Sequence, residues 1–148
     1  MVDTYQNFWM NKMSLIKLIN FNVIGDARGS LVALEQSKDI PFDIKRVYYL
    51  YGMQSCVPRG FHAHKDTVQV AVCLNGSCEI LMDDGITKET ITLNSPSQGL
   101  LIDVMQWHEM YNFSENCILM VMANEVYKES DYIRNYDEFL KEIENVNN

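Results

Sequence analysis

Two histidines, His62 and His64, are separated by one residue in the segment RGFHAHK. The segment is expected to be a strand, in which side chains at positions i and i+2 point the same way, so both imidazoles should face one side and Phe61 and Ala63 the other. Histidine transfers protons near neutral pH, and a neutral imidazole is also a common metal ligand. Spacing alone fits a reactive pair and two ordinary hydrogen-bonded or surface histidines equally well.

Two cations flank the histidine pair. Arg59 lies three residues before His62, and Lys65 directly follows His64. Arg59 offers a planar fork that suits phosphate oxygens, and Lys65 offers a point charge, so the stretch favours an anionic substrate. We keep both as candidate binding residues, although a lysine at a strand end is more often simply solvated.

Short β-rich runs separated by turn residues extend from Leu15 to Ala123 and predict an antiparallel sandwich or barrel. In TVQVAVCL, residues 67–74, apolar residues alternate, so one face of this strand should be core. The pairs Asn75-Gly76 and Asp84-Gly85 each predict a hairpin with a type I′ turn. Strands are expected at LIKLIN, SLVALEQ, KRVYYLYG, RGFHAHK, TVQVAVCL, SCEILM, ITKETITL, GLLID and CILMVMA.

The end of the chain changes period and predicts a short amphipathic helix. Asn135 stands three residues before Glu138, as in a capping box. We therefore divide the chain into an N-terminal extension, residues 1–14, and a single domain, residues 15–148, that ends in this helix. The residues at helical spacing are Tyr132, Tyr136, Phe139, Leu140 and Ile143.

Composition limits the class of protein. With 148 residues, 47% of them hydrophobic and 22% charged, the chain is expected to form one packed domain. Its net charge of −8 has the wrong sign for binding nucleic acid through the overall field, so a phosphate-bearing ligand needs a local basic pocket. No apolar run is long enough to span a membrane, and the N-terminus lacks the features of a secretory signal. We expect a cytoplasmic protein without membrane or nucleic-acid partners.

The four cysteines, Cys56, Cys73, Cys78 and Cys117, lie apart in apolar, strand-like contexts without CxxC spacing. Such spacing does not indicate a disulfide framework, and none of the four sits in an activating motif. We interpret them as reduced core thiols.

The histidine strand resembles the first motif of the cupin superfamily, which runs Gly, five residues, His, one, His, three or four, Glu, six, Gly. Here His62 and His64 are followed at this spacing by Gln69 and Gly76. Gln69 replaces the glutamate, and Cys56 stands where the first glycine belongs.

The second cupin motif, in which a histidine is followed after three residues by asparagine, is matched by His108 and Asn112. Its proline and glycine fall on Asp103 and Met105. The match predicts that His108 is a third member of the polar cluster.

A longer likeness connects DARGSL, KRVYY, RGFHAHK, WHEMYNFSENCILMVMA and YIRNYDEFL to the WxcM-like group of sugar-nucleotide 3,4-ketoisomerases, from about Leu15 to Leu140. The resemblance implies an all-β cupin jelly roll with a short C-terminal helix, and a homodimer with exchanged N-terminal strands. It also implies catalysis without a metal or other cofactor. The implied reaction converts dTDP-4-keto-6-deoxy-D-glucose to a dTDP-3-keto-6-deoxyhexose in deoxyamino-sugar biosynthesis.

This reaction needs a base and a proton donor. The hydrogen on C3 is acidified by the adjacent ketone, so its removal gives an enediol, and reprotonation at C4 leaves the ketone on C3. The resemblance places this work on His62, as principal base, and on His64, as its partner or as donor to the enolate oxygen. Tyr48 could supply a hydroxyl to the sugar oxygens, and because Tyr48 and Tyr49 alternate, only one of them faces inward. A tyrosine in a strand is also often plain core.

Further binding residues follow from the same resemblance. Arg28, in the turn-like DARGSL, resembles an arginine of related deoxysugar-nucleotide cupins that reaches the diphosphate, sometimes from the partner subunit. A solvated turn charge explains Arg28 equally well. His108, together with Trp107 or Tyr111, could form the wall that stacks on thymine, and a histidine at a sheet edge is the plain alternative.

Other functions stay open. A metal-dependent cupin such as a dioxygenase would use His62, His64 and His108 as ligands, although the amide of Gln69 is a weaker ligand than a carboxylate. A 3,5-epimerase would use similar deprotonation. A sugar-binding cupin without activity is disfavoured because proton carriers cluster with Arg59. The sequence leaves the C4 stereochemistry and the nucleobase open.

Overall fold

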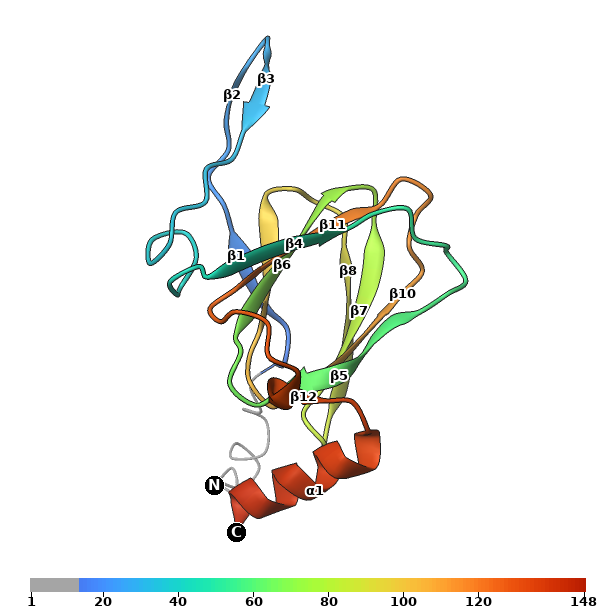
Figure 1. The fold of residues 1–148 in the computed structure, drawn as a ribbon. Helices are drawn as coiled ribbons and strands as arrows, with labels where there is room; N and C mark the ends of the chain where they lie inside the picture. The colour runs from blue at the N-terminus through green and yellow to red at the C-terminus, as the bar shows by residue number, and fades with distance from the viewer. Residues whose placement is uncertain (1–13) are drawn as a thin grey trace, which may run out of the picture.

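Two five-stranded antiparallel sheets face each other in the computed structural model, which describes residues 14–148 (Figure 1). The first sheet has the order β1 (Lys17–Asn20), β9 (Gln98–Ile102), β6 (Gln69–Asn75), β11 (Ile118–Ala123) and β4 (Arg46–Leu50). The second has the order β12 (Tyr132–Ile133), β5 (Arg59–His64), β10 (Trp107–Tyr111), β7 (Cys78–Asp83) and β8 (Lys88–Leu93).

The chain passes repeatedly from one sheet to the other, at β4–β5, β5–β6, β6–β7, β8–β9, β9–β10, β10–β11 and β11–β12. Inward-facing side chains of both sheets form one core, which includes Ile80, Met82, Leu100 and Leu119. This arrangement is a jelly-roll β-sandwich, so the predicted all-β class is confirmed. The cysteines are free, but Cys56 is exposed, and the expectation of a core thiol is wrong for it.

The alternation in β6 reflects two buried faces. Ala71 and Cys73 face the interior between the sheets, whereas Val70 and Val72 pack on the outside with Ile40. The segment after β3 covers this outer face, because its apolar side chains would otherwise be exposed. The strand predicted at SLVALEQ is therefore only partly confirmed. β3 (Gly29–Leu31) ends after the first two of these residues, and the rest belong to the segment that covers the outer face of β6.

The hairpin predicted at Asn75-Gly76 is wrong. β6 and β7 belong to different sheets and do not pair, and only Gly76 has a positive φ, 70°, whereas a type I′ turn needs one at both positions. The turn instead contacts the loop between β10 and β11, where the Ser77 amide donates to Ser114 Oγ at 2.9 Å.

At Asp84-Gly85 the predicted hairpin exists, because β7 and β8 pair with Asp83 opposite Lys88. Its turn is not type I′, since only Gly85 has a positive φ, 88°. The Asp84 carboxylate accepts from the Thr87 amide at 2.7 Å, which stabilises a longer loop.

The C-terminal helix α1 (Tyr136–Asn147) is confirmed, and it follows the short 3-10 helix η1 (Glu129–Asp131) and β12. Asn135 caps it by accepting from the Glu138 amide at 3.0 Å. Phe139 is buried against Trp107, with ring centroids 5.7 Å apart, so the helix closes one end of the sandwich. Tyr132 is not helical as predicted, because it pairs with His64 in the sheet. Within residues 14–148, no helix is long and apolar enough to cross a membrane.

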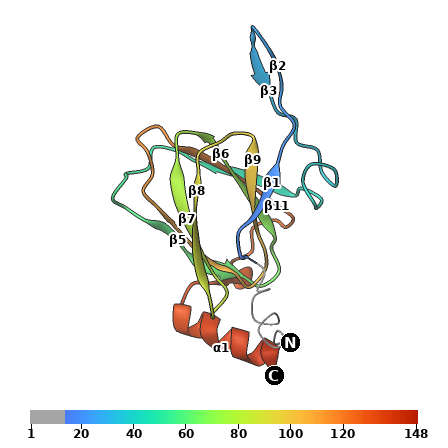
Figure 2. The same cartoon turned by 180° about the vertical axis from the view of Figure 1, so that it is seen from behind.

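A hairpin of β2 (Ile24–Asp26) and β3 projects away from the sandwich in both views (Figures 1 and 2). Ile24 and Leu31 are exposed on it, and Arg28 lies at its turn. The sequence did not predict strand β10, which carries His108 and lies at the centre of the second sheet. The alternative of a histidine at a sheet edge is therefore wrong.

Candidate active site

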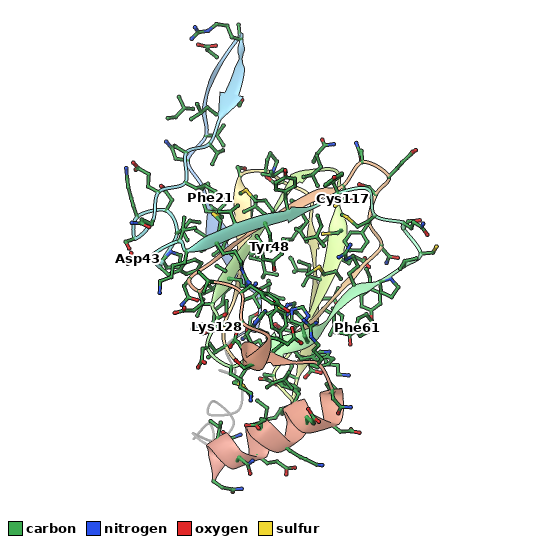
Figure 3. All side chains as sticks on the ribbon, in the orientation of Figure 1. Phe21, Asp43, Tyr48, Phe61, Cys117 and Lys128 are labelled. Carbon is green, nitrogen blue, oxygen red and sulfur yellow. The ribbon has the colours of Figure 1, made fainter. Side chains whose placement is uncertain are left out.

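A cavity of about 510 Å³ opens between β4, β5 and β12. Its volume falls within the range of about 300–1,000 Å³ that is typical of small-molecule sites. Tyr48 lies over the middle of the sandwich in Figure 3, on the wall formed by β4. The lining side chains important for the chemistry are Tyr48, His62, Tyr132, Arg46, Arg59 and Arg134.

A β-bulge in β5 brings Arg59 and His62 to the same side. His62 pairs with His108 and Gly60 with Glu109, so Phe61 is an extra residue with φ 60°. In an unbroken strand, positions 59 and 62 would face opposite sheet faces. Gly60 has φ 91°, and a Cβ there would lie 2.9 Å from the carbonyl oxygen of His108. The bulge therefore requires glycine at this position.

The three histidines form one cluster. The ring centroids of His62 and His64 lie 5.0 Å apart, those of His62 and His108 4.5 Å apart, so the predicted common orientation is confirmed. His64 and His108 are buried, and only His62 of the three lines the cavity. Burial lowers the pKa of His62 to about 4 and the pKa of His108 to about 3. All three rings can therefore be neutral at pH 7, since burial also lowers the pKa of His64.

Asp131 fixes the orientation of His64. The Asp131 carboxylate lies 2.9 Å from His64 Nδ1, and it also accepts from the Asp66 amide at 2.6 Å and from the Thr67 hydroxyl. Although burial opposes ionisation, these hydrogen bonds lower the pKa of Asp131. A carboxylate at this position makes Nδ1 the protonated nitrogen of neutral His64. The lone pair then lies on Nε2, which is buried and has no hydrogen-bond partner among the described residues.

The tautomer of His108 is also fixed by a hydrogen bond at Nδ1. Its Nδ1 lies 3.1 Å from the carbonyl oxygen of Gln106, which can only accept, so Nδ1 carries the proton. His108 Nε2 and His62 Nδ1 are buried and have no partner within residues 14–148. The possible ligand nitrogens of the three rings lie within 4.8 Å of one another. The cluster can thus exchange protons, and its geometry also fits one divalent cation.

Tyr48 is the inward member of its tyrosine pair, because Tyr49 is exposed. The Tyr48 hydroxyl accepts a hydrogen bond from the Gln69 amide at 2.9 Å. Burial raises the pKa of Tyr48 to about 12, so its hydroxyl stays protonated and can donate to an oxygen in the cavity. Gln69, in the place of the cupin glutamate, therefore positions Tyr48.

Three of the four arginines in the chain, Arg46, Arg59 and Arg134, line this one cavity. Arg134 binds Glu129, with Nε and Oε1 2.7 Å apart. In the described part of the chain, no carboxylate forms an ion pair with Arg46 or Arg59. A chain with net charge −8 thus concentrates guanidinium groups where an anionic ligand could bind.

Comparison with known proteins agrees with this geometry. The model of the FdtA family, described as WxcM-like, C-terminal, matches residues 14–144. The chain belongs to this family. It is 55% identical over 131 residues to the TDP-4-oxo-6-deoxy-alpha-D-glucose-3,4-oxoisomerase of Aneurinibacillus thermoaerophilus. The matched region covers 88% of this chain and 94% of that protein.

Solved structures give the same grouping. The 3,4-ketoisomerase QdtA of Thermoanaerobacterium thermosaccharolyticum, solved as a variant with TDP-4-keto-6-deoxyglucose, matches with a TM-score of 0.87 and 44% identity over 90% of this chain and 96% of that one. The TDP-quinovose 3,4-ketoisomerase WlaRB of Campylobacter jejuni matches with a TM-score of 0.83 and 48% identity over 87% and 99%. The rmlC epimerase of Mycobacterium tuberculosis, at 15% identity, shares the fold alone.

Of the six predicted binding residues, only Arg59 lines the cavity, and His108 is buried in the histidine cluster beside it. Arg28 is exposed on the β2–β3 hairpin and binds Asp26. Lys65 is exposed beside the cluster. Trp107 is buried beneath α1, and Tyr111 packs edge-on against Phe61. Within one chain, the structure brings together His62, His64, His108, Tyr48 and Arg59.

Sequence reasoning missed four groups of this site in the FdtA-family chain: Arg46, Asp131, Tyr132 and Arg134. Tyr132 packs edge-on against His64, with ring centroids 4.4 Å apart, and the Arg134 guanidinium lies 4.2 Å from the centre of the Tyr132 ring. The signal for Tyr132 was hidden because its spacing also fits the helical pattern. Arg46 has a usable signal, since it lies two residues before Tyr48 on a predicted strand and must share its face.

Proposed function

We propose that this chain converts TDP-4-keto-6-deoxy-D-glucose to a TDP-3-keto-6-deoxyhexose in deoxysugar biosynthesis. The observation that carries the proposal is the cluster of three imidazoles, of which His62 opens onto a cavity with three guanidinium groups. The names of the related isomerases support the same substrate class.

His62 is the proposed principal base, because of the three rings it alone lines the cavity. Its neutral imidazole accepts the proton from C3, and the electron pair forms the C3–C4 double bond while the C4 ketone oxygen becomes negative. The C4 oxygen takes up a proton and the C3 hydroxyl loses one, and protonation at C4 then gives the 3-ketone with a hydroxyl on C4. The reaction conserves protons and electrons, and the proposed mechanism uses no cofactor.

His64 is the proposed second proton carrier. Its ring lies 5.0 Å from that of His62, and Asp131 stabilises its imidazolium form, because the carboxylate is bonded to Nδ1. His64 can therefore hold the proton while the enediol exists, or donate it to the enolate oxygen. The Tyr48 hydroxyl is the proposed donor to a sugar oxygen, since its high pKa keeps it protonated.

Arg46, Arg59 and Arg134 are the proposed binding groups for the diphosphate. A guanidinium donates two parallel hydrogen bonds to phosphate oxygens, and Arg46 and Arg59 form no ion pair within the described residues that would compete. Arg134 is held by Glu129 and reaches the same cavity. The diphosphate of a TDP-sugar carries two negative charges, which would balance the charges of Arg46 and Arg59, since Arg134 is paired with Glu129.

A homodimer with exchanged N-terminal segments is the proposed assembly. The projecting hairpin exposes Ile24 and Leu31, whose apolar surface favours burial against a second copy. Arg28 lies at its turn, well outside the cavity of its own chain. A hairpin that reaches the neighbouring subunit would let Arg28 bind the partner's substrate.

The test is incubation of the full chain with TDP-4-keto-6-deoxyglucose, followed by carbon NMR. Movement of the ketone signal from C4 to C3 supports the proposal, and TDP-glucose, which lacks the ketone, should remain unchanged. Binding without conversion would instead support a sugar-binding cupin.

A metal-dependent cupin is the second candidate, because the three histidines could hold one divalent cation. Imidazole is a common ligand of iron, zinc and copper, so the three histidines fit such an ion. The cupin glutamate that would add a carboxylate ligand is replaced by Gln69, whose amide is hydrogen-bonded to Tyr48. Metal analysis of protein purified without chelator separates the candidates. Stoichiometric iron, manganese or zinc, together with activity that chelation abolishes, would favour the metal enzyme.

A further inference from the structure

Three of the four cysteines meet in the core, away from the proposed catalytic cluster. Cys73 lies on β6, Cys78 begins β7, and Cys117 directly precedes β11, and all three are buried. Their sulfur atoms lie within 4.8 Å of one another, and Cys73 Sγ and Cys117 Sγ are 3.8 Å apart. None lines the cavity, and Cys117 lies apart from Phe61 of β5 in Figure 3.

The backbone holds this cluster in place. The crossing between the sheets at Gly76 separates Cys73 from Cys78, so the two thiols come from facing sheets. The loop before Cys117 is fixed to the same crossing, because the Ser114 amide donates to the Ser77 carbonyl at 2.9 Å. Sulfur atoms from three segments are thereby arranged before any ligand binds.

The sulfur spacing suits a soft cation. A metal–sulfur bond of about 2.3 Å places three sulfurs in a trigonal plane about 4.0 Å apart. The 3.8 Å between Cys73 and Cys117 is close to this value, so binding needs little backbone movement. The candidate metal cluster contains three sulfurs and no carboxylate or histidine, whereas zinc in structural sites takes four ligands. Cu⁺ is stable with sulfur ligands alone.

We propose that Cys73, Cys78 and Cys117 form a binding site for a thiophilic d10 cation of the Cu⁺ class. The site goes beyond the proposed isomerase function and does not depend on it. A bound ion would connect the two sheets, since Cys78 belongs to one sheet and Cys73 to the other.

Thiolates rather than thiols bind metal ions, so coordination of Cu⁺ releases thiol protons to solvent. The positive charge of the ion offsets part of the negative charge that this release leaves on the sulfurs, which lowers the desolvation cost of the buried site.

The test uses the reduced full chain, titrated anaerobically with Cu⁺ in competition with the colorimetric chelator bicinchoninate. We expect one Cu⁺ retained per chain, and loss of at least tenfold in affinity in Cys73→Ser and Cys117→Ser. Cys56→Ser is the matched control, because Cys56 is exposed and outside the cluster, and it should bind as the unaltered chain does.

X-ray absorption of the unaltered chain keeps the test independent of variants that fail to fold. A first shell of three sulfurs at about 2.3 Å supports the proposal. Failure to retain Cu⁺ against the chelator, a shell of nitrogen or oxygen, or equal retention by Cys73→Ser would overturn it. Isomerase activity of the metal-free chain is a separate measurement, so neither result decides the other.

Discussion

Among the single residues of the site, Asp131 and His64 form the contact that fixes the position of a proton. A neutral imidazole has two tautomers, and only a fixed partner selects one of them. The Asp131 carboxylate, 2.9 Å from Nδ1, selects the tautomer with a free lone pair on Nε2. Asp131 is thus a positioning residue for a proton carrier that does not itself line the cavity.

Asp131→Asn should lower kcat by about 10²- to 10⁴-fold, the usual contribution of positioned acid–base groups, with little change in KM. The carboxylate opposes the lowering of the His64 pKa, so its loss should move the acid limb of the kcat profile to lower pH. Steady-state kinetics against pH measures both effects. Glu125→Gln, which alters a partly exposed carboxylate paired with Lys45, is the control. An unchanged kcat in Asp131→Asn would contradict this role.

At the scale of elements, the bulge in β5 decides which side chains share the cavity. Arg59 opposes Met110 and His62 opposes His108, and these two residues of β10 lie on one face. A regular β5 would turn Arg59 away from His62. The local backbone, held by Gly60, therefore joins the anion site to the base.

Gly60→Ala should destabilise the fold and remove most activity. Its φ of 91° costs about 1–2 kcal/mol for a residue with a Cβ, and the approach to the His108 carbonyl adds about 1–3 kcal/mol. Gly52→Ala is the matched control, because Gly52 has φ 67° but nothing within 4 Å of the added Cβ. Chemical denaturation of both variants should show the larger loss for Gly60→Ala. Equal losses would mean that the contact with β10 is unimportant.

Sequence patterns predicted most of the strands and the C-terminal helix, because alternation and capping are local properties, but they missed β2, β10 and β12. The predictions failed where contacts between segments far apart in the sequence determine the structure. Asn75-Gly76 has the composition of a hairpin turn, but it joins two sheets, and no local signal distinguishes these cases. The histidine pair was recognisable from its spacing, whereas Asp131 reaches His64 across 67 positions. Arg134 and Tyr132 likewise enter the site through the pairing of β12 with β5.

At the scale of the whole molecule, the buried histidines connect stability to pH. Their ordinary pKa is about 6.5 in the unfolded chain, whereas burial lowers that of His62 to about 4 and that of His108 to about 3 in the fold. Between these values the unfolded state binds more protons, so the free energy of unfolding should decrease as the pH falls below about 6.5. The slope should be at most about 1.4 kcal/mol per pH unit for each histidine.

Urea denaturation between pH 7.5 and 5 measures this slope. His108→Gln removes one titrating group and should reduce it. A slope that is identical in His108→Gln and the unaltered chain would mean that His108 has similar pKa values in the folded and unfolded states.

The proposed dimer predicts complementation between two defective chains. Arg28→Ala and His62→Ala homodimers should each have low activity. If Arg28 serves the partner's cavity, a mixed dimer contains one site with both defects and one intact site. Refolding the two variants together in equal amounts should therefore restore about a quarter of the unaltered activity, because half of the dimers are mixed and each has one intact site of two. No recovery in mixed dimers of confirmed composition would contradict exchange of the hairpin.

The most direct test of the central mechanism is exchange of the C3 hydrogen of TDP-4-keto-6-deoxyglucose with solvent deuterium, followed by proton NMR. The unaltered chain should exchange the C3 hydrogen and place solvent deuterium on C4 of the product, whereas His62→Ala, with its fold verified by circular dichroism, should do neither at a measurable rate. Exchange in His62→Ala at the rate of the unaltered chain would contradict the assignment of His62 as the base.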